Sequence, residues 1–269
     1  MKFTFATWNV NYRKFKESHL AFLREIRPDI LALQEVSPHF FRELSSSNLF
    51  SNYHYSMDYN YIQRGADSSR PRKRGCAVLS SSDILLRKPL LILDLPYPEK
   101  CLILDAELDE TVIKICSFHT PPGVTVKELK PLSHMVLAEW LKTRDHQVIL
   151  GIDANAPDVD HPNLAENVWY WEDEPKLLGK DRIHDLRDAY RDYLMSNPDL
   201  FETIVEDRPE GPLAVSHVTG KGSKGTGRRY DFIFITPDIR VQKVEYIFKK
   251  ACDAGSDHAL VYAELEIDS

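Results

Sequence analysis

Carboxylate, amide and imidazole side chains stand at the ends of apolar runs along the whole chain. They are Asn9, Glu35, His119, Asp153 with Asn155, Asp231, and the pair Asp257-His258. Each apolar run is typical of a buried strand, and in layered α/β folds strand ends converge on one edge, where ligands bind. Apart from the two histidines, none of these residues is basic. The pattern predicts a pocket lined by carboxylates.

Each of these residues, taken alone, also has a structural explanation. Asp153-Ala154-Asn155 suits an Asx turn, and Asp257 suits the cap of a closing turn. Glu35 precedes a predicted helix start, and a buried histidine such as His119 is often a hydrogen-bonded core residue. The occurrence of all of them in series favours a shared site.

Oxygen ligands without a cysteine or histidine cluster favour Mg²⁺, with Mn²⁺ as a substitute, over zinc. A magnesium ion held by one or two carboxylates keeps positions open for water and for phosphate oxygens. Such a site suits hydrolysis of a phosphate ester, because the ion stabilises the phosphoryl charge while a carboxylate orients or deprotonates water. We therefore expect a metal-dependent phosphoric ester hydrolase.

Strand-like and helix-like segments alternate from end to end, which predicts a single α/β domain over residues 1–269. Helices are expected over 126–141 and 184–194, and a shorter one begins at Ser37-Pro38. Two polar stretches, 51–74 and 157–183, are predicted to be long surface loops. Predicted strands cover 29–33, 76–79, 101–108, 112–118, 147–152, 230–236, 241–248 and 259–267, after an opening strand with Phe3 and Phe5 on one face.

Composition limits the classes of protein that the chain can belong to. The 269 residues are 43% hydrophobic and 28% charged, as in folded soluble proteins, and the net charge is −7. A cationic coat for nucleic acid or membranes is therefore excluded, and a polyanion would be held by local patches or metal ions. The four cysteines lack CxxC spacing and are expected to be buried free thiols. With no signal peptide or apolar run of transmembrane length, the sequence predicts a cytoplasmic protein.

The polar positions form a series of short motifs that resembles the endonuclease/exonuclease/phosphatase superfamily, which includes deoxyribonuclease I. Each motif is weak alone, but six in the family's order, from residue 8 to residue 258, are specific. The motifs are Trp8-Asn9-Val10, Gln34-Glu35-Val36, Phe118-His119-Thr120, Gly151-Ile152-Asp153-Ala154-Asn155, Tyr230-Asp231-Phe232-Ile233 and Ser256-Asp257-His258. The resemblance implies a four-layer sandwich, in which two packed mixed β-sheets are flanked by helices.

The resemblance also implies a metal site and an attacking water. Glu35 would be the main Mg²⁺ ligand, with Asn9 beside it and Asp257 completing or supporting the metal site. Asp153 would orient and deprotonate the attacking water, and Asn155 would help to position that water and the phosphate.

The histidines receive their roles from the same resemblance. His258 would donate to a phosphate oxygen, with Asp231 holding its tautomer and charge. His119 would be a second phosphate donor or the acid for the leaving oxygen. In deoxyribonuclease I a glutamate pairs with the matching histidine, but here Arg72-Lys73-Arg74-Gly75 stands in that place. The partner of His119 is therefore not identified, and the aspartate motif also departs from the usual Gly-Asp-x-Asn.

Two basic stretches stand out from the acidic background. Arg70, Arg72, Lys73 and Arg74 form one, while the other contains Lys221, Lys224, Arg228 and Arg229 among glycines. The second runs into Asp231, so Lys224, Arg228 and Arg229 are candidates for binding substrate phosphates. A solvated flexible loop is the other interpretation. Trp169, Tyr170 and Trp171 would either stack bases or fasten their loop to the core.

Three functions remain open at this point. A Mg²⁺-dependent nuclease acting on nucleic acid is favoured by the paired histidines and the basic loops. A phosphatase or phosphodiesterase for a small phosphorylated molecule or a lipid headgroup is favoured by the acidic net charge. A non-catalytic binding module is disfavoured, because every metal-binding and water-activating residue is present.

Overall fold

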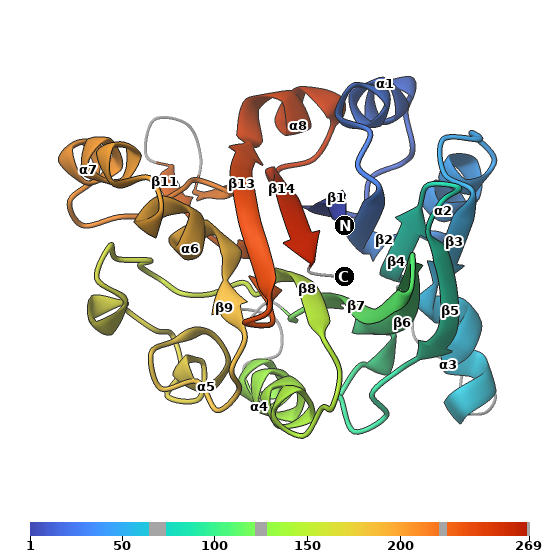
Figure 1. The fold of residues 1–269 in the computed structure, drawn as a ribbon, viewed down its shortest axis with the longest axis horizontal. Coiled ribbons are helices and arrows are strands. Elements are labelled where there is room, and N and C mark those ends of the chain that lie inside the picture. Colours follow the sequence, from blue (N-terminus) through green and yellow to red (C-terminus); the bar gives the residue numbers. More distant parts are fainter. Residues whose placement is uncertain (65–73, 122–127, 221–224, 268–269) are drawn as a thin grey trace.

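Two six-stranded mixed sheets face each other in the computed structural model, which describes residues 1–64, 74–121, 128–220 and 225–267 (Figure 1). In spatial order, the first sheet contains β13 (Ile239–Ile247), β14 (Leu260–Ile267), β1 (Lys2–Asn9), β2 (Ile30–Val36), β4 (Gly75–Ser80) and β3 (Asn52–Tyr55). The second contains β5 (Leu85–Leu90), β6 (Cys101–Leu108), β7 (Thr111–His119), β8 (Val148–Asp153), β12 (Asp231–Ile235) and β9 (Arg187–Asp188). A separate ribbon pairs β10 (His217–Thr219) with β11 (Thr226–Arg228).

Helices cover the outer faces of both sheets (Figure 1). The helices of the described residues are α1 (Glu17–Ile26), α2 (Pro38–Ser45), α3 (Ser56–Arg64), α4 (Leu129–Lys142), α5 (Pro175–Leu178), α6 (Ala189–Met195), α7 (Pro198–Asp207) and α8 (Phe248–Ala254), with 3₁₀ turns η1 (Pro98–Lys100) and η2 (Leu164–Glu166). Of these, α6 and α7 pack into the cluster between the sheets. Apolar side chains of α1, α2 and α8 pack on the first sheet, and those of α4 and α5 pack on the second. A third cluster fills the space between the sheets, which confirms the four-layer sandwich.

The two-residue period of the strands decides which side chains face the other sheet. In β8, Ile149 lies in the cluster between the sheets, whereas Leu150 and Ile152 pack outward against the helices. The same parity places Asp153 on the inward face, at the end of the strand. In β1, Phe3 and Phe5 face inward, so the expected common face is confirmed.

A polar layer separates this core from the inward-facing strand ends. Gln34 Nε2 donates to Thr7 Oγ1 at 2.9 Å and to Ser117 Oγ at 3.0 Å, and all three side chains are buried. Beside them, a Cβ on Gly151 would lie 2.7 Å from Thr7 Cβ. Gly151 therefore lets the backbones of the two sheets approach closely.

Most predicted elements agree with the structure within a few residues. β6 spans 101–108 as expected, and α2 begins at Pro38 with Ser37 Oγ accepting from Phe40 N at 3.1 Å. The expectation of a loop over 51–74 is wrong in its first part, which forms β3 and α3. The helix predicted over 184–194 begins only at Ala189, because β9 precedes it.

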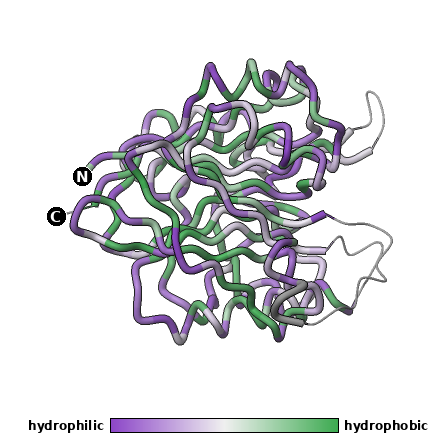
Figure 2. The backbone as a smooth tube through the Cα atoms, turned by 90° about the vertical axis from the view of Figure 1, so that its right-hand side faces the viewer, coloured by the Kyte–Doolittle hydropathy of each residue, from purple (hydrophilic) through white to green (hydrophobic). Residues whose placement is uncertain are grey.

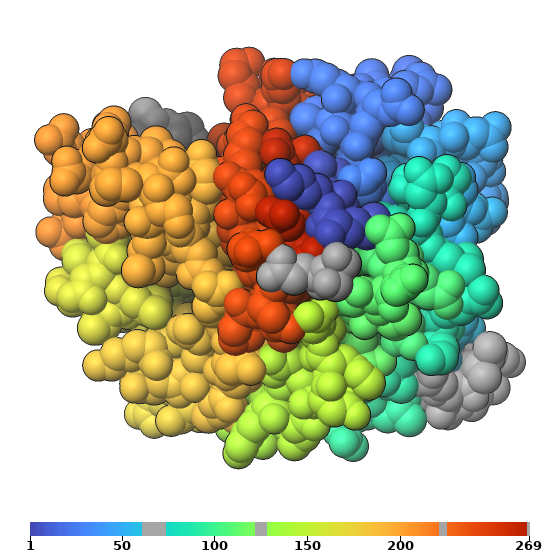
Figure 3. Space-filling model, in the orientation of Figure 1, coloured from blue at the N-terminus to red at the C-terminus, as the bar shows by residue number. Residues whose placement is uncertain are grey.

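Both chain ends lie at one end of the strands. Met1 N donates to Ile267 O at 2.7 Å, and the N- and C-terminal segments lie side by side on the face seen in Figure 3. In Figure 2 the hydrophobic segments run through the middle of the molecule and both termini lie at one side. The polar ends of β1, β7 and β8 are at the other end of these strands. Among the described residues, no helix combines the length and apolarity needed to cross a membrane.

Candidate active site

Strand register in the second sheet brings three predicted site residues into one row. His119 is paired with Asp153 across the parallel strands β7 and β8. Asp231 is paired with the same Asp153 across the antiparallel strands β8 and β12. Since paired residues of neighbouring strands present their side chains on the same face, all three face the first sheet.

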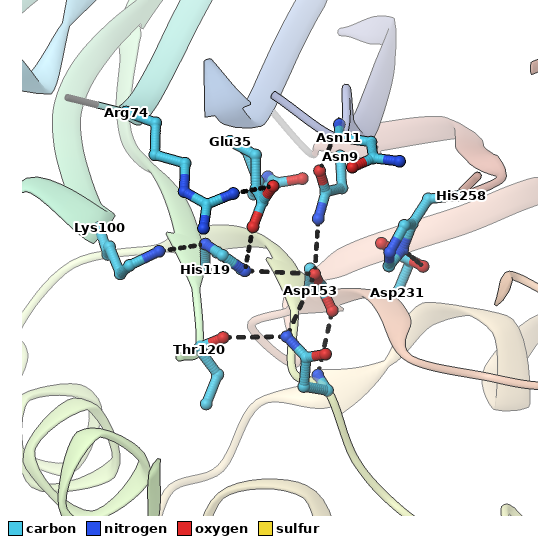
Figure 4. Close-up of polar contacts among 12 residues, drawn as sticks. Asn9, Asn11, Glu35, Arg74, Lys100, His119, Thr120, Asp153, Asp231 and His258 are labelled. Atoms are coloured by element: carbon cyan, nitrogen blue, oxygen red, sulfur yellow. Dashed lines mark hydrogen bonds and ion pairs between the residues drawn. The ribbon is translucent and has the colours of Figure 1, made fainter. Parts of the chain in front are cut away.

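The first sheet supplies Asn9 and Glu35 to the same place (Figure 4). Asn9 ends β1, and its Nδ2 donates across the two sheets to Asp153 Oδ2 at 2.7 Å. Glu35 has a left-handed φ of 56°, next to an irregularity in the pairing of β2 with β4. Left-handed backbone is unusual for a non-glycine residue in a strand, and such bulges re-aim side chains. Here the bulge turns the Glu35 carboxylate toward His119.

Asp153 is the centre of the site and is only 1% exposed. Asn155 N donates to its Oδ1 at 3.0 Å, and the Asn155 side chain donates to Thr120 O at 2.9 Å. Burial, together with the nearby Asp231 carboxylate, raises the pKa of Asp153 to about 7 despite the attraction of His258. A carboxylate with a pKa near neutrality is suited to accept a proton from water.

His258 and Asp231 form a buried charged pair beside Asp153. His258 Nδ1 lies 2.8 Å from Asp231 Oδ2, and both side chains are at most 8% exposed. Burial opposes the imidazolium, but the carboxylates of Asp231 and Asp153 outweigh it and raise the pKa of His258 to about 10. His258 is therefore a cationic hydrogen-bond donor at neutral pH.

His119 lies between cationic and anionic groups (Figure 4). Its Nδ1 is 2.6 Å from Lys100 Nζ, and its Nε2 is 3.3 Å from Glu35 Oε1 and 3.5 Å from Asp153 Oδ2. Arg74 also binds Glu35, with 2.6 Å between Nη1 and Oε2. Burial and the nearby Lys100 lower the pKa of His119 well below its usual value, so the ring is neutral.

Ligand atoms of Asp153, Asp231 and His258 lie within 4.8 Å of one another, so this group is a candidate metal site. A second such group comprises His217, Asp257 and His258. Asp257 is exposed at the rim, with its Oδ1 3.9 Å from His258 Nε2. The sequence-predicted ligands Glu35 and Asn9 extend from β2 and β1 of the first sheet, where Asn9 contacts Asp153 and Glu35 contacts His119.

The prediction that Arg229 binds substrate phosphate is wrong. Its side chain is completely buried, and its guanidinium donates to the two Asp188 carboxylate oxygens at 2.8 and 2.7 Å. Arg228 is partly exposed and pairs with Asp158 at 2.7 Å. Lys224 lies outside the described residues.

Sequence reasoning missed two side chains that complete the site. Lys100, at the end of η1, is the partner of His119, and no motif surrounds it. His217 stacks on the ring of His258 with 4.5 Å between centroids, and an isolated bridge pairs the two residues. The only signal for His217 is its place in the strand before the glycine-rich stretch.

Comparison with known proteins decides the family. The model of the Endonuclease/Exonuclease/phosphatase family matches residues 6–258. The chain belongs to this family. Its members are phosphoester hydrolases, and this chain shares their catalytic fold. No curated protein sequence matches the chain significantly.

Solved structures of the family superimpose over nearly the whole chain. The D. rerio TDP2 structure complexed with single-strand DNA product has a TM-score of 0.70 and 13% identity, covering 98% of this chain and 99% of that one. The Bacteroides vulgatus endonuclease/exonuclease/phosphatase has a TM-score of 0.68 and 14% identity, covering 100% of both chains. The endonuclease domain of TRAS1, a telomere-specific non-LTR retrotransposon, has a TM-score of 0.60 and 14% identity, covering 99% and 100%. At these identities the likeness shows the fold alone.

Proposed function

We propose that the protein is a Mg²⁺-dependent nuclease that hydrolyses phosphodiester bonds of nucleic acid by attack of water. The observation that carries this proposal is the buried Asp153, which joins donors from both sheets at one point. A base, a cationic donor and neutral donors around one carboxylate are what in-line hydrolysis of a phosphate ester needs.

Asp153 orients the attacking water and takes its proton. Its pKa near 7 keeps much of the carboxylate ionised at neutral pH and still basic enough to accept a proton. Asn9 and Asn155 hold the carboxylate in place through Nδ2 and the backbone N–H respectively.

His258 and His119 donate to the non-bridging oxygens of the phosphate. The His258 imidazolium, held by Asp231, stabilises the charge that grows on these oxygens in the transition state. His119 offers a neutral donor from the other side of Asp153.

The oxygen donors of the candidate active site suit a hard cation such as Mg²⁺ or Mn²⁺. Glu35, Asn9 and Asp257 would hold it, and all three offer oxygen ligands without a competing thiol. Among the described residues, the buried Asp231 Oδ1 has no hydrogen-bond partner, which adds an unused oxygen. His258 is less suited as a ligand, because an imidazolium has no lone pair for a metal. When bound, the ion would neutralise phosphoryl charge and activate water.

Nucleic acid is the proposed substrate because similar proteins act on it or bind it. TDP2 was crystallised with single-strand DNA product, and the TRAS1 domain is an endonuclease. Arg228 would add a phosphate contact at the rim once a substrate displaced Asp158. Arg229 is buried and paired with Asp188, so it is not available to a phosphate backbone, and the net charge is −7. These observations favour a small phosphate ester as the second candidate.

The test is Mg²⁺- and Mn²⁺-dependent hydrolysis of a substrate panel. It contains plasmid DNA, single-stranded DNA and RNA, an abasic-site duplex, bis-p-nitrophenyl phosphate and p-nitrophenyl phosphate. We expect metal-dependent cleavage of a polynucleotide that weakens steeply as salt rises, because phosphate contacts release counterions. Turnover of the small esters alone would refute the nuclease and support the second candidate.

A further inference from the structure

Lys100 approaches the side of His119 that faces away from Asp153. Its ammonium nitrogen lies 2.6 Å from His119 Nδ1, within hydrogen-bond distance. Lys100 ends η1 and leads directly into β6, and its neighbour Cys101 is paired with Phe118 in β7. The position of Lys100 next to His119 is therefore fixed by η1 and by the pairing of β6 with β7.

The other ring nitrogen of His119, Nε2, faces the carboxylate oxygens of two residues. Nε2 is 3.3 Å from Glu35 Oε1 and 3.5 Å from Asp153 Oδ2. A carboxylate oxygen accepts hydrogen bonds, whereas an ammonium can only donate them. Nδ1 therefore lies next to a hydrogen-bond donor, whereas Nε2 lies next to two hydrogen-bond acceptors.

We propose that Lys100 is a positioning residue that holds His119 as the tautomer with its proton on Nε2. In this tautomer the bare Nδ1 accepts from Lys100 Nζ, and Nε2–H points toward Glu35 and Asp153. The opposite tautomer would direct N–H against an ammonium and a lone pair against two carboxylates. The hydrogen bond at one nitrogen thereby sets the role of the other.

This assignment deepens the proposed function and rests on it for its catalytic meaning. A donor fixed on Nε2 is ready for a phosphate oxygen before substrate arrives, so no reorganisation is needed. A second proton on Nδ1 would face the Lys100 ammonium, with Arg74 adding another cation beside Glu35. Of the two roles open to His119, the structure favours the neutral donor over the acid. A carboxylate in place of Lys100 would favour the opposite, because it would accept a proton from Nδ1.

The tautomer is measured directly by long-range ¹H–¹⁵N NMR of the full chain with ¹⁵N-labelled histidine, with and without Mg²⁺. The chain has ten histidines, so the His119 signals are identified by their loss in His119→Gln. We expect a protonated Nε2 and a bare Nδ1. A protonated Nδ1, alone or together with Nε2, would overturn the proposal. Because this measurement needs no substrate, it tests the tautomer of His119 independently of the proposed function.

Variants of Lys100 connect the tautomer with catalysis. Lys100→Met removes the donor, so we expect mixed tautomers and a kcat on the order of tenfold lower at an unchanged KM. Lys100→Gln keeps an N–H donor and is expected to restore both the spectrum and most of kcat. Lys114→Met, which removes the partly exposed partner of Asp105, is the control and leaves the His119 spectrum unchanged. If Lys100→Met and Lys100→Gln lost the same share of kcat and the tautomer of His119 did not change, Lys100 would have only a structural role and the proposal would be wrong.

Discussion

The charge of His258 depends chiefly on the carboxylate of Asp231. The pair is buried, so the imidazolium has little water to stabilise it and relies on Asp231, with help from Asp153. In the proposed mechanism, this charge stabilises the non-bridging oxygens of the phosphate. Any change that neutralises His258 should therefore slow the chemical step without loosening the fold of the strands.

Asp231→Asn should lower the pKa of His258 from about 10 toward neutrality. The sign follows from the loss of an anion: burial then disfavours the imidazolium, and the ring loses its proton as pH rises past neutrality. At about pH 8 the wild type keeps this charge and the variant does not, so kcat of the variant falls as pH rises. An NMR titration of the His258 Cε1–H signal measures the pKa.

Asp257→Asn is the matched control for that titration. Asp257 is exposed and its carboxylate lies 3.9 Å from His258 Nε2, so solvent screens its attraction. We expect the pKa of His258 to change much less than in Asp231→Asn. Equal changes in the two variants would contradict the assignment of Asp231 as the group that holds the charge.

At the scale of elements, a buried ion pair fastens the loop that follows β8. Lys130, in the first turn of α4, pairs with Glu174 Oε1 at 2.5 Å and donates to Asn155 O at 2.7 Å. Both charged side chains are at most 2% exposed. Glu174 in turn accepts from Tyr170 N at 2.9 Å, so the long segment 157–183 is joined to α4 and to Asn155.

Lys130→Met should therefore destabilise the fold and reduce kcat together. Removal of one partner leaves the Glu174 carboxylate buried without its cation, which costs about 3 kcal/mol or more. Urea unfolding gives the stability. Lys142→Met, at an exposed position of the same helix, should change it by less than about 0.5 kcal/mol. A Lys130→Met protein as stable as Lys142→Met would show that the pair contributes nothing.

The strands and the polar residues that end them were predictable, because alternation and strand-end chemistry are local signals. β6 and β8 were located closely, and Asn9, Asp153 and Asp231 do converge. The part of 51–74 that forms β3 and α3 was missed, because its polar composition hides two short elements, of which β3 is held by pairing with β4.

The cations of the site could not be assigned from the sequence. Arg229 lies in a basic run beside Asp231, yet its partners Asp188 and Asp160 are distant in the chain and reach it only in the fold. Lys100 carries no motif and meets His119 only because β6 and β7 pair. Long-range contacts of this kind leave no local pattern.

At the scale of the whole molecule, the site requires two sheets to approach closely. Asn9 of the first sheet reaches Asp153 of the second at 2.7 Å. Just below, Gly151 leaves no room for a side chain, since an added Cβ would lie 2.7 Å from Thr7 Cβ and Oγ1. The spacing of the sheets and the geometry of the site are therefore coupled.

Gly151→Ala should push the sheets apart locally, at a cost of about 1–3 kcal/mol in the free energy of unfolding, and lower kcat by weakening the Asn9–Asp153 contact. Urea unfolding and steady-state kinetics measure the two effects. The control is Gly227→Ala in β11, where an added Cβ meets only the Val215 side chain at 2.9 Å. Loss of stability and activity no greater than in this control would contradict the coupling.

The central claim is that Asp153 activates water for metal-dependent hydrolysis of a phosphate ester. The most direct measurement is the Mg²⁺-dependent rate of wild type, Asp153→Asn and the exposed control Asp94→Asn on the best substrate of the panel, with urea unfolding of each. We predict that Asp153→Asn folds and loses on the order of a thousandfold in kcat, while Asp94→Asn keeps the wild-type rate. A folded Asp153→Asn protein that hydrolyses the substrate at the wild-type rate would contradict the claim.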